Sequence, residues 1–74
     1  MESNKFDCMV AEINTLDFVI DAEMVDRDEL TGVLDVHFES GNFEKLKACL
    51  NFKYDNIQVD DPAGRWTWVW INDW

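Results

Sequence analysis

The sequence predicts a small, mainly β protein, folded as an antiparallel meander of five to six strands that curls or partly closes into a barrel. Three observations predict this class. Apolar residues alternate with polar ones along most of the chain, turn residues separate the alternating stretches, and 74 residues suffice for one domain. Apolar residues make up 47% of the chain, which is enough for a packed core despite the high charge. Residues 1–74 are therefore expected to form a single domain.

The N-terminal stretch, residues 4–14, fits two structures. Phe6, Met9 and Ile13 recur at the spacing of an amphipathic helix, and Val10 would extend its apolar side. A tight turn after Ile13 would instead let the same stretch pair with the following one as a strand. We favour the strand, because the neighbouring stretches alternate, and keep one short N-terminal helix as the alternative.

Two alternating stretches, LDFVIDAEM and GVLDVHFES, predict the next pair of strands. Face parity leaves few registers between them, and two neighbouring ones are the candidates. The first places Glu23 opposite Asp35. It also places Asp21 opposite His37, whereas the second places Asp21 opposite Asp35. In both registers carboxylates lie next to one another, which is an unfavourable arrangement for a sheet.

The stretch EKLKACLNFKY also alternates, and the turn residues SGN precede it. It therefore predicts a further strand that forms a hairpin with the preceding one and pairs Phe38 with Leu46. Leu46, Leu50 and Phe52 would then all point toward the core.

A second hairpin is predicted around the residues DPAG, because Pro and Gly supply the backbone angles of a tight turn. This turn would bring Val59 beside Trp66 and Ile57 beside a second tryptophan, Trp68. Trp66, Trp68 and Trp70 share one parity. They could form a stacking platform, but the large area that aromatic rings bury predicts that they belong to the core.

Charge is distributed unevenly along the chain. Sixteen acidic and six basic residues give a net charge of −10, and residues 1–44 hold twelve of the acids but only two bases. Such a charge repels nucleic acids and anionic membranes and attracts basic proteins. The carboxylates expected to form an uncompensated, partner-binding surface are Asp17, Asp21, Glu23, Asp26, Asp28, Glu29, Asp35 and Glu39.

The acidic strand face predicts a binding protein that inhibits a basic, nucleic-acid-handling partner such as a nuclease or toxin. Side chains on one strand face repeat every ~6.7 Å, which is comparable to the phosphate spacing, so the face can act as a DNA mimic. By charge, size and fold class the chain resembles immunity proteins against bacteriocin nucleases, and the acidic inhibitors that phages carry against restriction or CRISPR nucleases. This resemblance implies an inhibitor and carries over no individual residue.

The alternative hypothesis is a non-enzymatic structural or oligomerising module, such as a homodimer, in which the acids serve solubility. Its interface would consist of the outward apolar residues Phe6, Val10, Val19, Val25 and Val33. A third hypothesis is a small barrel that binds an apolar or cationic ligand among its tryptophans.

Residues with catalytic or metal-binding chemistry are few. Asp35, His37 and Glu39 share a strand face, but a single His without CxxC spacing predicts an exposed ion pair rather than a metal site. The sequence has no nucleophile motif and no Gly-rich phosphate loop, so we expect no enzyme activity and no cofactor. Cys8 and Cys49, and the lack of a signal peptide or a long apolar segment, predict reduced thiols in a cytoplasmic protein.

Overall fold

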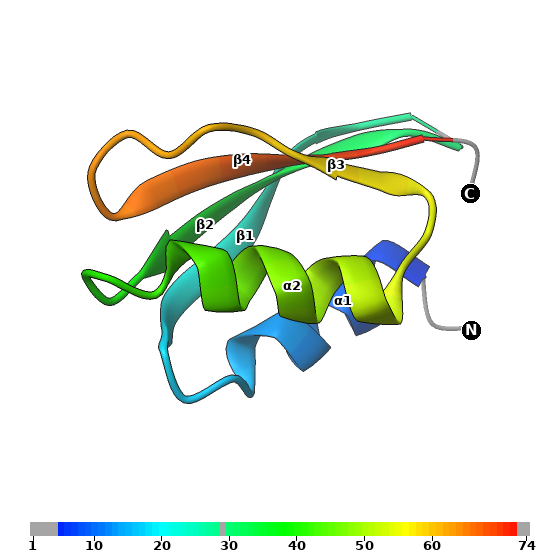
Figure 1. Ribbon diagram of the computed structural model, residues 1–74. Coiled ribbons are helices and arrows are strands. Elements are labelled where there is room, and N and C mark those ends of the chain that lie inside the picture. Colours follow the sequence, from blue (N-terminus) through cyan, green and yellow to red (C-terminus); the bar gives the residue numbers. More distant parts are fainter. Residues whose placement is uncertain (1–4, 29, 73–74) are drawn as a thin grey trace.

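Four strands and two helices form two layers in the computed structural model, which describes residues 5–28 and 30–72 (Figure 1). In chain order the elements are α1 (Lys5–Asn14), β1 (Val19–Arg27), β2 (Gly32–Phe38), α2 (Phe43–Lys53), β3 (Ile57–Val59) and β4 (Trp66–Ile71). Neighbouring strands are antiparallel, in the order β1-β2-β4-β3. The chain therefore forms two hairpins, β1–β2 and β3–β4, that join through β2 and β4, with α2 as the connection between them.

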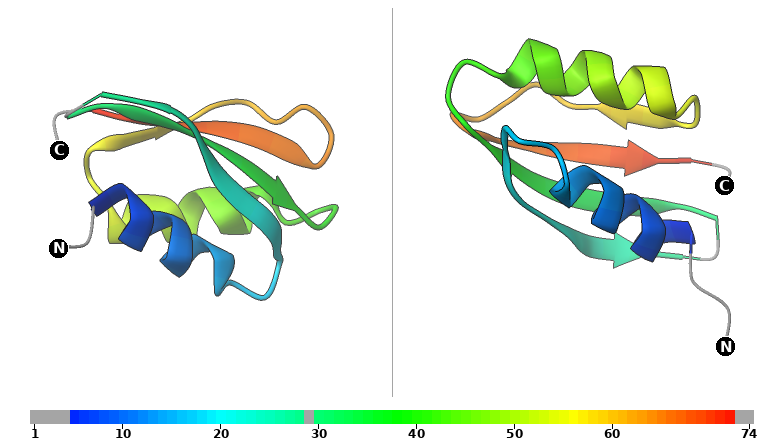
Figure 2. Two further views of the ribbon diagram at one scale, coloured as in Figure 1. Left: turned by 180° about the vertical axis from the view of Figure 1, so that it is seen from behind. Right: turned by 90° about the horizontal axis from the view of Figure 1, so that it is seen from below.

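Both helices lie against the same face of the sheet, and within the described residues the opposite face has no covering element (Figures 1 and 2). The core lies between the helices and the sheet, and each of its apolar side chains is at most 3% exposed. It consists of Phe6, Met9, Ile13, Ala22, Leu34, Val36, Phe38, Leu46, Leu50, Val69 and Ile71. Burial of this apolar area, at roughly 25 cal/mol per Å², is the main source of stability.

The N-terminal stretch is the helix α1, so the strand that we favoured from the sequence is wrong and the alternative is confirmed. Phe6, Met9 and Ile13 are all buried on one side of this helix. A strand would have placed Phe6 on the opposite face from Met9 and Ile13, because their numbers differ in parity. Only the helical period brings these three side chains to one core.

The stretch predicted as a third strand is the helix α2, and the predicted hairpin between Phe38 and Leu46 does not form. Leu46 and Leu50 are 0% and 1% exposed, whereas Phe52, which a strand would have pointed inward, is 92% exposed. Residues 43–53 contain no β-branched residue and include three Lys, two Leu and one Ala, which favours a helix. Positions four residues apart share a face in helices and in strands alike, so the two leucines fitted both structures.

The β1–β2 hairpin confirms the first of the two predicted registers. Glu23 pairs with Asp35. Asp21 pairs with His37. Two β-bulges interrupt the register, one near each end of β1, and bulges of this kind increase the local twist of a strand.

The β3–β4 hairpin confirms that the two segments pair, but the predicted register is wrong. The observed partners are Ile57 with Ile71, Gln58 with Trp70, and Val59 with Val69. Each partner on β4 lies three residues beyond the predicted one, because the loop returns later, at a bridge between Ala63 and Trp66. Gly64, with a φ of 71°, supplies the left-handed backbone of that turn. An odd shift reverses the faces of a strand, so it moves the tryptophans out of the core.

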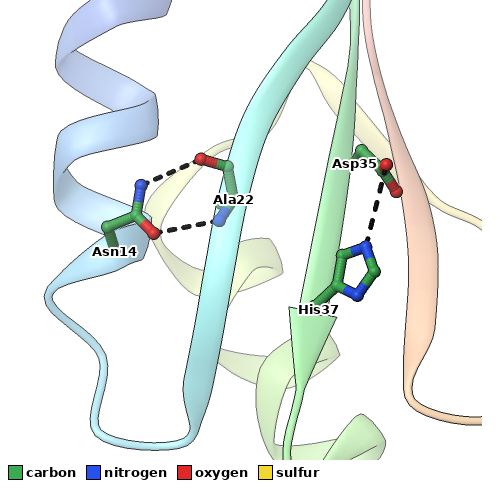
Figure 3. A network of polar contacts seen from close by, with 4 residues as sticks. All are labelled: Asn14, Ala22, Asp35 and His37. Atoms are coloured by element: carbon green, nitrogen blue, oxygen red, sulfur yellow. Dashed lines mark hydrogen bonds and ion pairs between the residues drawn. The ribbon is translucent and has the colours of Figure 1, made fainter.

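The sheet is open, with four strands in the described residues, so the five to six strands and the partly closed barrel of the sequence prediction are corrected. Its outer strands are β1 and β3. The Asn14 side chain pairs with the free edge of β1: its Nδ2 donates to the Ala22 carbonyl and its Oδ1 accepts from the Ala22 N–H, each at 2.9 Å (Figure 3). Asn14 thus satisfies backbone groups that would otherwise be open to pairing with another chain.

Candidate functional site

The uncovered face of the sheet carries three cross-strand rows of side chains, because residues paired across antiparallel strands point to the same side. The rows are Asp21–His37–Trp66, Glu23–Asp35–Trp68 and Asp26–Val33–Trp70–Gln58. We call these residues the open face. Each row begins with a carboxylate on β1 and carries a tryptophan on β4.

The carboxylate column of the open face lies on β1. Asp21, Glu23 and Asp26 are all exposed. Glu23 lies directly opposite a fourth carboxylate, Asp35 on β2. Like charges that face each other across strands destabilise a sheet, so this pairing costs stability that a neutral pair would not.

Three tryptophans, Trp66, Trp68 and Trp70, follow one another along β4, and we call them the tryptophan row. The prediction that these rings form the core is wrong. Trp68 and Trp70 are each 40% exposed. The ring centroids of Trp66 and Trp68 are 5.3 Å apart at 83°, and those of Trp68 and Trp70 are 6.3 Å apart at 86°. The core positions of β4 are instead taken by its other residues, Thr67, Val69 and Ile71.

Asp35 occupies the centre of the open face, with a side chain that is only 19% exposed. Its Oδ2 lies 3.8 Å from Nε2 of His37, which is 51% exposed (Figure 3). This contact confirms the predicted pairing of an exposed histidine with a carboxylate. The other oxygen of Asp35, Oδ1, is buried and accepts no hydrogen bond from the described residues.

Asp60 adds a carboxylate on the far side of the tryptophan row. Its Oδ2 accepts a hydrogen bond from Nε1 of Trp70 at 3.2 Å. Its N–H donates to the Trp68 carbonyl at 2.9 Å, and its own carbonyl accepts from Oγ1 of Thr67 at 2.8 Å. Carboxylates therefore border the tryptophans on both sides, Asp35 from β2 and Asp60 from the end of β3.

Basic residues lie elsewhere in the molecule. Lys45, Lys47 and Lys53 all belong to α2, on the covered side of the sheet. Arg27 pairs with Gly32 at the end of β1, and its guanidinium lies 5.5 Å from the centre of the Phe6 ring. The three rows of the open face consequently contain no lysine or arginine among the described residues.

Half of the predicted partner-binding carboxylates belong to the open face, namely Asp21, Glu23, Asp26 and Asp35. The others do not belong to its rows: Asp17 precedes β1, Asp28 begins the β1–β2 turn, and Glu39 follows β2, all three exposed. Glu29 lies outside the described residues.

The residues of this site that the sequence did not predict are the exposed rings of Trp68 and Trp70, and Asp60. The sequence signal that could have indicated an exposed tryptophan row was the helical spacing of the N-terminal stretch. A helix on one side of a small sheet leaves the other side uncovered, and the alternative parity of β4, with Thr67, Val69 and Ile71, supplies a sufficient apolar face.

The chemistry available on the open face is the binding of cations. Carboxylates attract lysine and arginine, and tryptophan rings attract the same groups through their π-electron faces. Among the described residues no cluster of three or more His, Cys, Asp or Glu side chains has the arrangement of a metal site. Cys8 and Cys49 are both free thiols.

Comparisons with protein-family models, curated proteins and solved structures found no match to this chain. In the described part of the chain, neither helix has the length and hydropathy of a membrane span. The function is therefore inferred from the open face itself.

Proposed function

We propose that this chain is a non-enzymatic binding protein that docks the open face of its sheet onto a basic, nucleic-acid-handling protein and thereby inhibits it. One observation carries the proposal: the uncovered face combines a carboxylate column, a tryptophan row and no base within its described rows. This combination disfavours a nucleic acid as the direct ligand and favours a protein surface rich in lysine and arginine.

The two halves of the open face would contribute to binding in different ways. The carboxylates of β1 raise the rate of association with a basic partner and select its charge. The tryptophans supply apolar area, and Trp is among the residues that most often dominate the energy of an interface. Exposed rings beside carboxylates suit arginine in particular, because a guanidinium stacks on an aromatic ring while it donates hydrogen bonds to a carboxylate.

The spacing of the carboxylates on β1 supports a partner that normally binds a nucleic acid. Asp21 and Glu23 are two residues apart on one strand, a separation of ~6.7 Å that is comparable to that of phosphates. A surface built to bind phosphates would therefore find one pair of charges at a similar interval on β1, at Asp21 and Glu23. Occupation of that surface would exclude the nucleic acid and inhibit the partner.

The test compares two triple variants of equal charge. The face variant carries Asp21→Asn, Glu23→Gln and Asp35→Asn. The control variant neutralises three exposed carboxylates outside the open face, with Asp7→Asn, Glu44→Gln and Asp55→Asn. Each immobilised protein is incubated with a nuclease-treated bacterial lysate at low salt, and bound proteins are eluted in salt steps and identified.

The purified captured protein is then assayed for nucleic-acid binding or cleavage with each variant added. We expect the wild-type chain and the control variant to inhibit it, and the face variant to lose at least tenfold in inhibition. Equal inhibition by the face variant would exclude the open face as the binding surface. Capture of proteins whose activity the chain does not change would contradict its role as an inhibitor.

The oligomerising module stays an alternative, but the interface suggested for it from the sequence is not one surface. Phe6 is 3% exposed and belongs to the core, and Val10 and Val19 pack partly against that core. Val25 is 56% exposed. A dimer that persists at high salt in sedimentation analysis would favour this alternative over the proposed inhibitor.

A further inference from the structure

A hollow of about 180 Å³ lies between the loop that follows β3 and the start of β4. Figure 1 shows that this loop bows away from β4 before it returns at the turn. The lining residues are Asp60, Asp61, Ala63, Trp66, Thr67 and Trp68. The hollow therefore adjoins one end of the tryptophan row and combines aromatic rings with two carboxylates.

The two tryptophan rings that line the hollow are nearly perpendicular. Trp66 and Trp68 meet at 83° with their centroids 5.3 Å apart. The T-shaped contact sets the edge of one ring against the face of the other and holds both in place. Cations bind over the faces of such rings, and Trp is the aromatic side chain that attracts them most strongly.

The two carboxylates of the hollow differ in how they are held. Asp60 is fixed by the bond from Trp70 to its side chain and by the bonds that its backbone makes with Thr67 and Trp68. Asp61 is exposed. Among the described residues no lysine or arginine forms an ion pair with either, and Arg65, although next to Trp66 in sequence, does not line the hollow.

We propose that this hollow receives the guanidinium group of one arginine side chain of the basic partner. The inference rests on the proposed function and specifies a residue type that the partner would contribute. A planar guanidinium can stack on a tryptophan ring and donate to a carboxylate at once, whereas a lysine ammonium is a compact, strongly hydrated charge. A larger hollow of about 290 Å³ lies at the other end of the row, but its lining pairs Asp26 and Asp28 with a base, Arg27.

The test needs no partner. The ¹⁵N-labelled chain is titrated with the blocked tripeptide Gly-Arg-Gly, with its neutral isostere Gly-citrulline-Gly, and with Gly-Lys-Gly, while the indole N–H signals are followed by NMR. We expect saturable shifts of the Trp66 and Trp68 signals with the arginine peptide, and at least fivefold weaker binding of the citrulline and lysine peptides. Asp61→Asn should weaken binding of the arginine peptide at least threefold, and the matched variant Asp55→Asn should leave it unchanged.

Equal binding of the arginine and citrulline peptides would overturn the proposal, and so would unchanged binding to the Asp61→Asn variant. Shifts of backbone amide signals in the same spectra that are confined to β1, with the indole signals unchanged, would overturn it as well. If the arginine peptide does not bind the hollow, while inhibition of the captured protein still depends on the open face, the arginine site is excluded and the proposed function stands. A working arginine site in a chain that inhibits no captured protein would instead show that the proposed function had failed.

Discussion

The helical layer and the open face of the sheet differ in both charge and apolar exposure. The helices together carry four lysines and three carboxylates, so their charge is nearly balanced. The described rows of the open face carry four carboxylates and no lysine or arginine. Buried leucines on α2 are at most 1% exposed, whereas Trp68 and Trp70 on the open face are each 40% exposed. The helical layer is thus built for stability, and the open face is not.

This difference places the energetically unfavourable features of the sheet on one of its two sides. Large exposed aromatic rings side by side promote unwanted association, and a carboxylate opposite another carboxylate weakens strand pairing. Both features occur on the same side of the same sheet. A surface that is unfavourable for the isolated molecule becomes favourable when a basic, apolar-tolerant partner covers it.

The largest expected effect is on the stability of the helical layer. Leu46→Ala should lower the free energy of unfolding by about 2–5 kcal/mol, because Leu46 is fully buried and the truncation leaves a cavity. Phe52→Ala on the same helix should change it by less than about 0.5 kcal/mol, because that ring is 92% exposed. Urea unfolding of both variants measures the two values. Similar losses in both would contradict the helical structure of residues 43–53.

The next effect concerns the edge of the sheet. Asn14→Ala removes both hydrogen bonds to the backbone of Ala22 and should cost about 1–3 kcal/mol. The same change at the exposed Asn51 of α2 is the control and should cost much less. Because the edge of β1 is then open, the Asn14 variant should also associate at high concentration, which sedimentation would detect. A monomeric variant of unchanged stability would exclude this role for Asn14.

A smaller effect is expected at the hydrogen bond from the Tyr54 hydroxyl to Glu12, which ties the end of α2 to α1. Tyr54→Phe keeps the ring and should cost about 0.5–1.5 kcal/mol at pH 7. Burial, together with the hydrogen bond to Glu12, raises the pKa of Tyr54 above its usual value. The contribution is therefore fully present below pH ~10 and is lost as the pH rises toward the raised pKa. The difference in stability between wild type and variant should shrink over that range; a constant difference would contradict it.

The smallest expected effect is that of removing one charge, which should raise the stability when the charge is on the open face and lower it when the charge is on the helical layer. Glu23→Gln should stabilise the protein by about 0.2–1 kcal/mol, because it removes a like-charge pair with Asp35. Glu44→Gln should destabilise it by about 0.3–1 kcal/mol, because Glu44 lies in the first turn of α2, where a negative charge is favourable. Thermal unfolding at low ionic strength should show both shifts, and added salt should reduce them. Destabilisation by Glu23→Gln would mean that the open face is not strained by its charge.

The β1–β2 half of the open face could be predicted from the sequence, because the alternation of acidic and apolar residues leaves few registers. Glu23 opposite Asp35 is one of the two registers that parity left open, and it is the one observed. The helix α2 could not be separated from a strand by period, since Leu46 and Leu50 fit both. Its lack of β-branched residues was the better signal.

The tryptophan half of the open face could not be predicted in the same way. Its orientation depends on where the loop after β3 returns, and a shift of three residues there exchanges the two faces of β4. The large area that aromatic rings bury predicted that Trp66, Trp68 and Trp70 belong to the core. The position of the helices determines which face of β4 is buried, because they cover the face that carries Thr67, Val69 and Ile71 (Figure 2).

The most direct test of the open face is selective quenching of tryptophan fluorescence. In a Trp74→Phe background, the three rings of β4 report, and the quenchers Cs⁺ and I⁻ are compared with their effect on free N-acetyltryptophanamide. We expect clear quenching with a strong preference for Cs⁺, and the face variant, but not the control variant, should reduce that preference. Rings that resist both quenchers, or a preference for Cs⁺ that persists in the face variant, would contradict an exposed tryptophan row bordered by carboxylates.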